Sequence, residues 1–390
     1  QKEQNLTEKS KTSKNREYVV ITYLFLALFL ALVGCFVYFE AVRSETFINS
    51  SYNKRQDLFA KTVVRGEILD RNGLVLAETK VDAEGNETRN YPFERTFSHV
   101  VGYSSNGKSG IESYMNLKLL RSHIFFTEKL KNEFQGEKSP GDNVYTTMDA
   151  TLQETAYDAL GDHEGAVVVL EPSTGKILAM VSKPDYNPNT IEEDWERITS
   201  DDNTESVLLN RATNGLYPPG STFKIFTTLE YIRENPDYEN YKYTCNGKFS
   251  KDSTTIHCYG NEVHGEEDLI TSFANSCNSS YANIGLTLDA GSFNKTCDSL
   301  LFNQPLPYAY GSKQSSFHRK EDASASDIIE SAIGQGETLV TPLHMALVTS
   351  AIANNGVLMK PYLIDHVTNV NGDPVESYEP EMYGTLLTQE

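Results

Sequence analysis

The chain has 390 residues, which is enough for two domains that each bury a hydrophobic core. Its formal net charge is −20, and so acidic a surface repels both nucleic acid and anionic lipid headgroups, which excludes them as partners. Five cysteines are too few for a disulfide-stapled scaffold, which excludes that class of small secreted protein.

The first element in chain order is an apolar segment without charge, residues 18–39, long enough to cross a bilayer. Basic residues in the tail before it, 1–17, predict a cytoplasmic N-terminus and an exported remainder. Two alternatives stay open: a cleaved signal peptide, and a lipoprotein box at Leu32–Cys35. The apolar run continues through Phe36–Phe39, where a mature lipoprotein would turn polar. We therefore expect a single-pass anchor in the cell membrane.

Residues 40–142 are expected to form a stalk and a β-rich domain. Asp70–Gly73 supplies turn residues between two apolar runs, which predicts a strand, a turn and a strand over residues 63–76. The other expected elements are a polar helical stalk over 40–61, a charged loop over 80–89, a helix over 110–120 and a boundary at 139–142.

Residues 143–390 are expected to form a second domain. Its predicted elements are a strand from 143, a helix over 151–161, a hairpin with arms 166–170 and 177–181, an acidic loop over 192–205, and helical segments within 269–288 and 326–355. Helices mixed with a hairpin predict an antiparallel sheet covered by helices, so the fold class is α+β.

Ser221 and Lys224 lie at the start of an amphipathic stretch, residues 224–232, directly after Pro218-Pro219-Gly220. A spacing of three places the hydroxyl and the amine on one face of a helix, one turn apart. A buried lysine with a lowered pKa can take the proton of a serine and make it a nucleophile. The alternative is an ordinary serine at a helix N-terminus.

The Ser-x-x-Lys pattern alone is uninformative, because it recurs at Ser51/Lys54, Ser105/Lys108, Ser173/Lys176 and Ser292/Lys295. Context separates the copies. Ser173 lies in the predicted hairpin turn, Ser105 has loop composition, and Ser51 is too near the membrane segment to enter a core. Only Ser221 opens an amphipathic helix.

A second constellation, Ser276-Cys277-Asn278, follows in the segment 269–288. A hydroxyl at Ser276 and an amide at Asn278 could face the same cleft as Ser221. The pattern is weak by itself, since Ser104/Asn106 and Ser292/Asn294 also fit it, and polar residues packed between helices are the alternative.

Cys245 and Cys258 flank a short polar stretch that we expect outside the membrane, where a disulfide can persist. With His257 and His264 nearby, a zinc site is an alternative, and two free thiols are another. The spacing lacks the close cysteine pair usual at zinc sites. We therefore favour the disulfide and expect no metal and no cofactor.

Taken together, these segments resemble the penicillin-binding proteins, specifically the monofunctional class B transpeptidases that cross-link peptidoglycan. The resemblance covers residues 65–359 and rests on several separate segments. They are residues 65–73 and 110–116 of a pedestal domain, the hairpin 165–181, the active-serine motif 217–224, the second motif 276–278, and the segment 333–346 beside the cleft.

The resemblance implies a role for each site residue. Ser221 would attack the penultimate D-alanine carbonyl of a stem peptide, Lys224 would take its proton, Ser276 would relay a proton to the leaving D-alanine, and Asn278 would bind the peptide amide. The implied partners are peptidoglycan stem peptides, β-lactams and a polytopic membrane glycan polymerase. The alternatives are a D,D-carboxypeptidase, a penicillin-hydrolysing enzyme, a penicillin sensor, and a non-catalytic scaffold that activates the polymerase.

The family's third motif, Lys-Thr-Gly or a close variant, should lie on a strand of the sheet well after Gly336, and no such tripeptide occurs there. Lys295-Thr296-Cys297 precedes Gly334 and has helical or loop context, so we reject it as a substitute. We expect the chain to be part of a longer protein, with the last strands of the transpeptidase sheet missing. The hairpin over 166–181 would then expose an unpaired edge, and the isolated chain would fold poorly and acylate slowly.

Overall fold

The computed structural model describes residues 2–39, 55–200, 202 and 205–388. Contacts divide the chain into two compact units, residues 1–60 and residues 61–390, which are described separately below. We call residues 61–390 the body.

The first unit contains one long helix, α1 (Lys2–Tyr38). Its part Tyr18–Tyr38 has 21 residues and is long and apolar enough to cross a membrane. Most of the predicted stalk, residues 40–54, lies outside the described residues. Its end is the short helix α3 (Arg55–Ala60).

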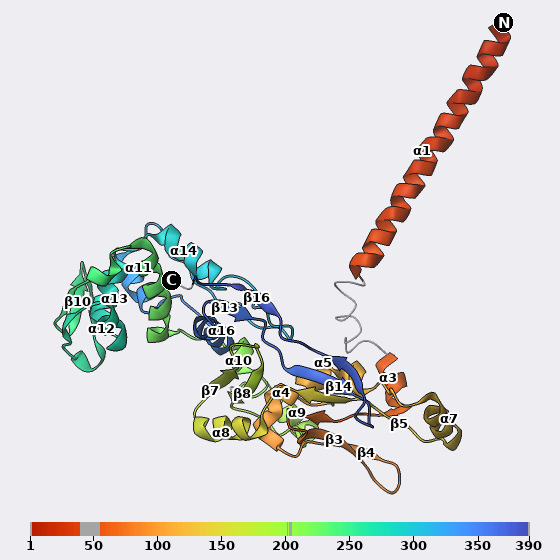
Figure 1. Cartoon of the computed structure of the whole chain (residues 1–390), viewed down its shortest axis with the longest axis horizontal. Helices are drawn as coiled ribbons and strands as arrows, with labels where there is room; N and C mark the ends of the chain where they lie inside the picture. Colours follow the sequence, from red (N-terminus) through yellow and green to blue (C-terminus); the bar gives the residue numbers. More distant parts are fainter. Residues whose placement is uncertain (1, 40–54, 201, 203–204, 389–390) are drawn as a thin grey trace. The chain divides into compact units, whose positions relative to one another are not determined.

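A six-stranded sheet lies at one end of the body, with the strand order β15-β14-β6-β2-β3-β4 (Figure 1). The strands are β2 (Ile68–Leu69), β3 (Val75–Val81), β4 (Glu87–Asn90), β6 (Asn143–Thr146), β14 (Ile364–Thr368) and β15 (Pro374–Ser377). β2 pairs antiparallel with β3 and parallel with β6. The Asp70 carboxylate accepts the backbone N–H groups of Asn72 and Leu74 at 2.7 and 2.8 Å, which forms the predicted turn.

The charged loop expected over residues 80–89 is wrong. β3 continues to Val81 and pairs with β4 as the outer hairpin of the sheet. The Asp82 side chain accepts the N–H groups of Glu84 and Asn86 and so closes the turn. The charged side chains lie on a solvent-exposed edge of the sheet, where a strand can form without alternating apolar residues. The sequence of residues 80–89 therefore resembles that of a loop.

The sheet crosses the boundary expected at residue 142. β6 lies in its middle, and β14 and β15 come from the far end of the chain. β14 pairs antiparallel with β6, from Ile364 opposite Thr146 to Thr368 opposite Asn143. Pairing between strands more than 200 residues apart has no local signal in a sequence.

A buried ion network joins the helices of this end to the sheet. Glu112, which is fully buried, accepts hydrogen bonds from Arg65 at 2.6 Å and Arg89 at 2.7 Å. These two arginines satisfy both carboxylate oxygens and offset the cost of burying the charge. The helices here are α4 (Ser98–Val101), α5 (Gly110–Tyr114), α6 (Asn116–Leu119) and α7 (Phe126–Gln135), so the helix expected over 110–120 is divided at Met115.

The predicted hairpin is present as β7 (Gly165–Leu170) and β8 (Ile177–Lys183), which pair antiparallel. α8 (Ala150–Leu160) begins at Asp149, whose side chain accepts the Leu152 N–H, and packs on the hairpin. β8 is mostly buried, but β7 is half-buried along its length. Among the described residues, this sheet has only these two strands.

The acidic loop expected over residues 192–205 is also corrected, because it contains α9 (Ile191–Thr199). The helix buries Ile191 and Ile198 and carries Glu192, Glu193 and Asp194 in its first turn. Negative charge is favourable at a helix N-terminus, so the acidic run starts a helix here.

Several helices surround an aromatic core at the other end of the body (Figure 1). They are α11 (Lys224–Glu234), α12 (Leu269–Ala274), α13 (Asn278–Gly285), α14 (Ala290–Ser299) and α15 (Ala325–Ala332). α16 (Pro342–Ala353) contacts β7 and contributes side chains both to this core and to the core of the first end. The other described α-helix is α10 (Arg211–Asn214). The other described strands are β1 (Val63–Val64), β5 (Ser139–Pro140), β9 (Tyr243–Cys245), β10 (Lys248–Lys251), β11 (Thr254–His257), β12 (Gly265–Glu267), β13 (Val357–Met359) and β16 (Met382–Thr385).

Candidate active site

Ser221 lies in a single turn of 3-10 helix, Gly220–Phe223, that leads directly into α11. Gly220 has φ 56°, a left-handed conformation that glycine adopts without a steric penalty. Phe223 is fully buried and stacks on Phe226 at 5.0 Å, which holds the turn on the core. Ser221 itself is exposed. The turn therefore holds the hydroxyl at the surface on a rigid base.

Gly334 fixes the turn from the opposite side. The Gly220 N–H donates to the Gly334 carbonyl at 2.8 Å. A Cβ on Gly334 would lie 2.3 Å from the Gly220 oxygen, and φ at Gly334 is +72°. Only glycine permits this approach, so the segment that we matched beside the cleft lies directly against the serine turn.

The Lys224 amine lies at the centre of the site, and its side chain is buried at 1% exposure. Its Nζ is 3.2 Å from Ser221 Oγ and 2.9 Å from Ser276 Oγ. It also lies 2.7 Å from both the Ser276 carbonyl oxygen and Asn278 Oδ1. The structure thus brings together all four residues that the two motifs predicted.

The four contacts determine how a neutral amine is oriented. The Ser276 carbonyl and Asn278 Oδ1 can only accept, so they take the two N–H donors of a neutral Lys224. The lone pair then faces the hydroxyls of Ser221 and Ser276, from which it can accept a proton. Burial lowers the pKa of Lys224 to about 8, so the neutral form is accessible near neutral pH. This is the arrangement required of a general base.

Ser276 and Asn278 lie at a break between α12 and α13, so the helix expected across residues 269–288 is interrupted. Ser276 has φ 49°, an uncommon value for a residue with a side chain. Cys277 is buried and caps α13, because its sulfur accepts the Ser280 N–H at 3.3 Å. The tripeptide thus presents Ser276 and Asn278 to Lys224 and directs Cys277 inward.

A cleft of about 600 Å³ opens beside the serine. Its lining includes Ser221, Ser276 and Asn278 together with Gln335 from the glycine segment. Tyr259, which is 94% exposed, also lines it, and the motif analysis missed this residue because no pattern surrounds it. The cleft thus lies directly beside the Ser221 hydroxyl.

Lys295-Thr296-Cys297 is not part of this cleft lining. The tripeptide lies inside α14, where Thr296 and Cys297 are buried. This position agrees with the expectation that Lys295–Cys297 is not the third motif, because that motif lies on a strand in the family.

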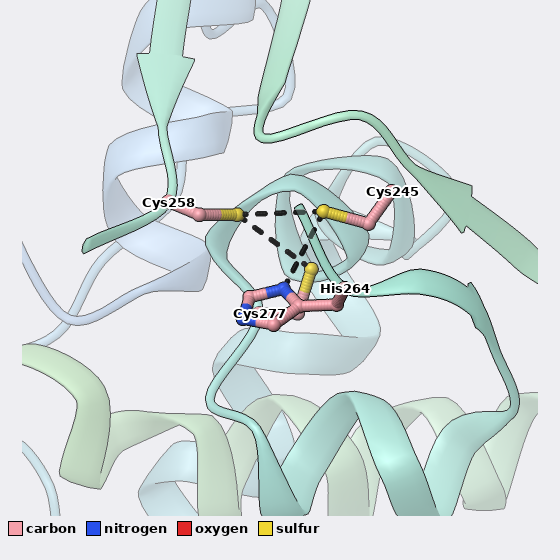
Figure 2. A group of neighbouring side chains, drawn as sticks. All are labelled: Cys245, Cys258, His264 and Cys277. Carbon is pink, nitrogen blue, oxygen red and sulfur yellow. Dashed lines mark hydrogen bonds between the residues drawn. The ribbon is translucent and has the colours of Figure 1, made fainter. Parts of the chain in front are cut away.

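The disulfide expected between Cys245 and Cys258 is wrong, because all five cysteines are free. The two sulfur atoms lie 3.6 Å apart, and Cys277 and His264 join them in one cluster (Figure 2). The sulfur atoms and one ring nitrogen of His264 all lie within 4.8 Å of one another. His257, the other histidine considered with the zinc alternative, is not one of the four donors. Three thiols and an imidazole are ligands that suit a transition metal.

Two family models match the chain. The model of the penicillin binding protein transpeptidase domain covers residues 165–386, which includes both motifs of the cleft. The chain belongs to the class B penicillin-binding proteins. The model of the penicillin binding protein A dimerisation domain matches residues 65–144 of this penicillin-binding protein, which contain β2, β3, β4 and the start of β6.

Relatives and solved structures agree with this assignment. A protein of Mycolicibacterium smegmatis named peptidoglycan D,D-transpeptidase PbpA is 32% identical over 338 residues, 81% of this chain and 68% of the relative. The ceftriaxone acyl-enzyme of penicillin-binding protein A from M. tuberculosis superposes with a TM-score of 0.76 at 27% identity, over 86% of this chain and 78% of that one. A D,D-transpeptidase domain from Eggerthella lenta gives a TM-score of 0.70 at 30% identity, over 83% and 78% of the two chains.

The chain thus spans about two thirds of the length of these curated relatives, 68% of the M. smegmatis protein and 65% of two from M. tuberculosis. The helix Tyr18–Tyr38 fits a single-pass membrane protein.

Proposed function

We propose that this penicillin-binding protein is a peptidoglycan D,D-transpeptidase that forms its acyl-enzyme on Ser221. The observation that carries the proposal is the 3.2 Å separation between the exposed Ser221 Oγ and the buried Lys224 Nζ, at the edge of an open cleft. The names of the relatives support the reaction, and the acyl-enzyme structure of the M. tuberculosis protein supports the covalent intermediate.

In the first half-reaction, Ser221 Oγ bonds to the carbonyl carbon of the penultimate D-alanine, and its proton passes to Lys224 Nζ. The C–N bond to the terminal D-alanine then breaks. Ser276 Oγ, 2.9 Å from Nζ, gives its proton to the leaving amine and regains one from the lysine. The products are an ester on Ser221 and free D-alanine. The backbone N–H of Ser221 is a donor for the oxyanion.

In the second half-reaction, the amine of a neighbouring stem peptide attacks the ester. Its proton passes through Ser276 and Lys224 to Ser221 Oγ as the ester bond breaks, which restores the enzyme and leaves a new amide cross-link. Asn278 binds the peptide amide in the family pattern. Here its oxygen also holds Lys224, and its Nδ2 donates to the His257 carbonyl at 3.0 Å. A role in orienting the lysine is therefore added to substrate binding.

The remaining parts of the proposal concern the surroundings of the enzyme. The basic residues in the first part of α1, before Tyr18, favour a cytoplasmic N-terminus, so the catalytic body would lie outside the membrane. Its substrates are stem peptides, and β-lactams compete with them. A polytopic glycan polymerase as partner rests on the family resemblance, and retention of such a protein on the purified Ser221→Ala variant would test it.

The experiment is labelling of intact cells that make the full-length protein, with a fluorescent penicillin that does not cross the membrane. We expect covalent labelling of the unaltered protein and none of Ser221→Ala, because that variant lacks the attacking oxygen. Ser173→Ala is the matched control, since it changes the serine of another Ser-x-x-Lys copy, exposed on the hairpin turn. It should be labelled normally.

Labelling of Ser221→Ala would exclude Ser221 as the nucleophile. Labelling only after the cells are opened would reverse the proposed orientation. Release of D-alanine that does not increase with an added acceptor amine, together with no dimer formation, would favour the carboxypeptidase alternative over the transpeptidase.

A further inference from the structure

The cluster of Cys245, Cys258, His264 and Cys277 has a geometry that packing alone does not explain. Zn–S bonds of about 2.3 Å at tetrahedral angles place two sulfur atoms about 3.8 Å apart, and a Zn–N bond of about 2.0 Å places the nitrogen about 3.5 Å from each sulfur. The observed Sγ–Sγ distances are 3.6 Å for Cys245–Cys258 and 3.8 Å for Cys258–Cys277. His264 Nδ1 lies 3.4 Å from Cys245 Sγ. These three distances match three of the six edges of a zinc tetrahedron, and the other three are within 4.8 Å, whereas a disulfide requires about 2.05 Å.

Each sulfur also has one hydrogen-bond donor of its own. The Gly247 N–H faces Cys245 at 3.4 Å, the Ser279 hydroxyl lies 3.1 Å from Cys258 Sγ, and the Ser280 N–H faces Cys277 at 3.3 Å. Such donors stabilise thiolates, which are the form that binds a metal. Each sulfur thus has a neighbouring group that can donate to it when a metal ion is bound.

The histidine is oriented in the same way. His264 directs Nδ1 at Cys245, while its Nε2 lies 3.8 Å from a carboxylate oxygen of Glu262. A carboxylate is therefore near the second ring nitrogen, the position in which metal-ligating histidines have their outer partners. The three buried cysteines and the half-buried histidine come from the ends of β9 and β11, the start of β12 and the start of α13, and Figure 2 shows them pointing toward one another.

We propose that these four side chains bind one zinc ion, and that the bound ion positions the second motif of the active site. Cys277 is the residue between Ser276 and Asn278. Its sulfur faces the cluster while both neighbours contact the Lys224 amine. A metal bond to Cys277 ties the tripeptide to the strands that carry Cys245 and Cys258.

The backbone of the tripeptide leads directly from the end of α12 to the cluster. Ser276 has a positive φ in a Schellman turn, in which the Cys277 N–H donates to the Ser272 carbonyl at 2.9 Å and the Ser276 N–H donates to the Phe273 carbonyl at 3.0 Å. A metal bond to Cys277 would fix the end of this turn, and with it the Ser276 carbonyl and hydroxyl beside Nζ. Cys277, Ser276 and Asn278 are positioning and site residues on one short segment, so metal binding and acylation are coupled. This second part of the inference rests on the proposed function, while the first does not.

The first measurement is metal content. The full-length protein, purified in detergent without chelator, should contain about one zinc per chain by mass spectrometry of the metal. Cys245→Ser should lose it, because serine is a poor zinc ligand, and Cys245→Asp should retain more of it, because a carboxylate binds zinc. Cys297→Ser is the matched control, since Cys297 is buried in α14 outside the cluster, and its zinc content should be unchanged.

The second measurement tests positioning without any variant. Removal of zinc with a chelator should lower the rate of penicillin acylation about 10- to 100-fold, as large an effect as the loss of an outer partner of a metal ligand has on activity. Added Zn²⁺ should restore the rate, and Mg²⁺ should not. The visible spectrum of the Co²⁺-loaded protein should show tetrahedral thiolate coordination, which a role in packing alone would not produce.

Three outcomes overturn the inference. A zinc content near zero in protein whose thiols are reduced, or a Cys245–Cys258 disulfide, excludes the metal site. Unchanged acylation after complete zinc removal excludes the positioning role. If Ser221 proves not to be acylated at all, the metal content and the cobalt spectrum still decide the site by themselves.

Discussion

The active-site cleft and the cysteine cluster share one tripeptide, but they are built in opposite ways. Ser221 and Lys224 lie one helical turn apart, so the geometry of a helix is enough to bring the two side chains together. The four donors of the cluster come from separate segments and meet only when those segments fold. Ser276 and Asn278 face the first site, and Cys277 faces the second. A single short segment can therefore couple a locally encoded site to one that depends entirely on the fold.

The largest effect should come from removing the base on the cleft side. Lys224→Ala should slow penicillin acylation of the full-length protein about 10³-fold, because Ser221 then loses the group that takes its proton. The measurement is stopped-flow or time-resolved labelling, with zinc content determined in parallel.

Lys295→Ala is the control for Lys224→Ala, since it removes an exposed lysine of another Ser-x-x-Lys copy and should leave the rate unchanged. Zinc should stay bound in Lys224→Ala. Loss of zinc in that variant would show that zinc binding depends on Lys224, whereas we expect the zinc site to be independent of this residue.

A smaller effect should come from changing the pH at which the acylation rate is measured. Burial lowers the pKa of Lys224 to about 8, and the neutral amine is the active form. The acylation rate should thus rise about tenfold per pH unit up to about pH 8 and level off above it. Rates between about pH 6 and 9 on protein with constant zinc content check this. A rate that is flat across this range would show that proton transfer to Lys224 does not limit acylation.

The smallest effect should come from weakening α12. It tests whether the zinc ion or this helix holds the tripeptide 276–278 in place. Asp268 accepts the Thr271 N–H in the capping box of α12, the helix before the tripeptide. Asp268→Ala should lower the free energy of unfolding by about 1 kcal/mol, seen in urea titration, because the helix end loses its acceptor.

Asp289→Ala removes the equivalent cap of α14 and should cost about as much stability. If zinc holds the tripeptide, neither variant changes acylation. A slower acylation of Asp268→Ala alone would assign the support to α12 instead.

The sequence predicted what is local and missed what is not. The turn at Asp70, the hairpin β7–β8 and the pair Ser221/Lys224 each depend on neighbouring residues, and each is present. The hairpin β3–β4 was missed because charge on an exposed edge hides its alternation. The helix across 269–288 was expected without its break because the pattern does not record the reversed φ at Ser276.

The cysteine cluster shows the same limit within the site. The sequence favours a disulfide between Cys245 and Cys258, because both flank a polar stretch expected outside the membrane, and it places Cys277 only within the second motif. Separations of 13, 6 and 13 residues along the chain carry no recognisable metal spacing, and the thiols meet only through β9, β11 and α13.

The position of β14 has a practical consequence for anyone who exchanges parts between related enzymes. β14 pairs with one edge of β6, so the six-stranded sheet contains strands from both ends of the body. A chimera joined at residue 142 would combine strands from two parents within one sheet. The exchangeable module consists instead of residues 61–146 together with 364–377. A hybrid that keeps this sheet intact therefore needs three junctions, after residue 146, before residue 364 and after residue 377.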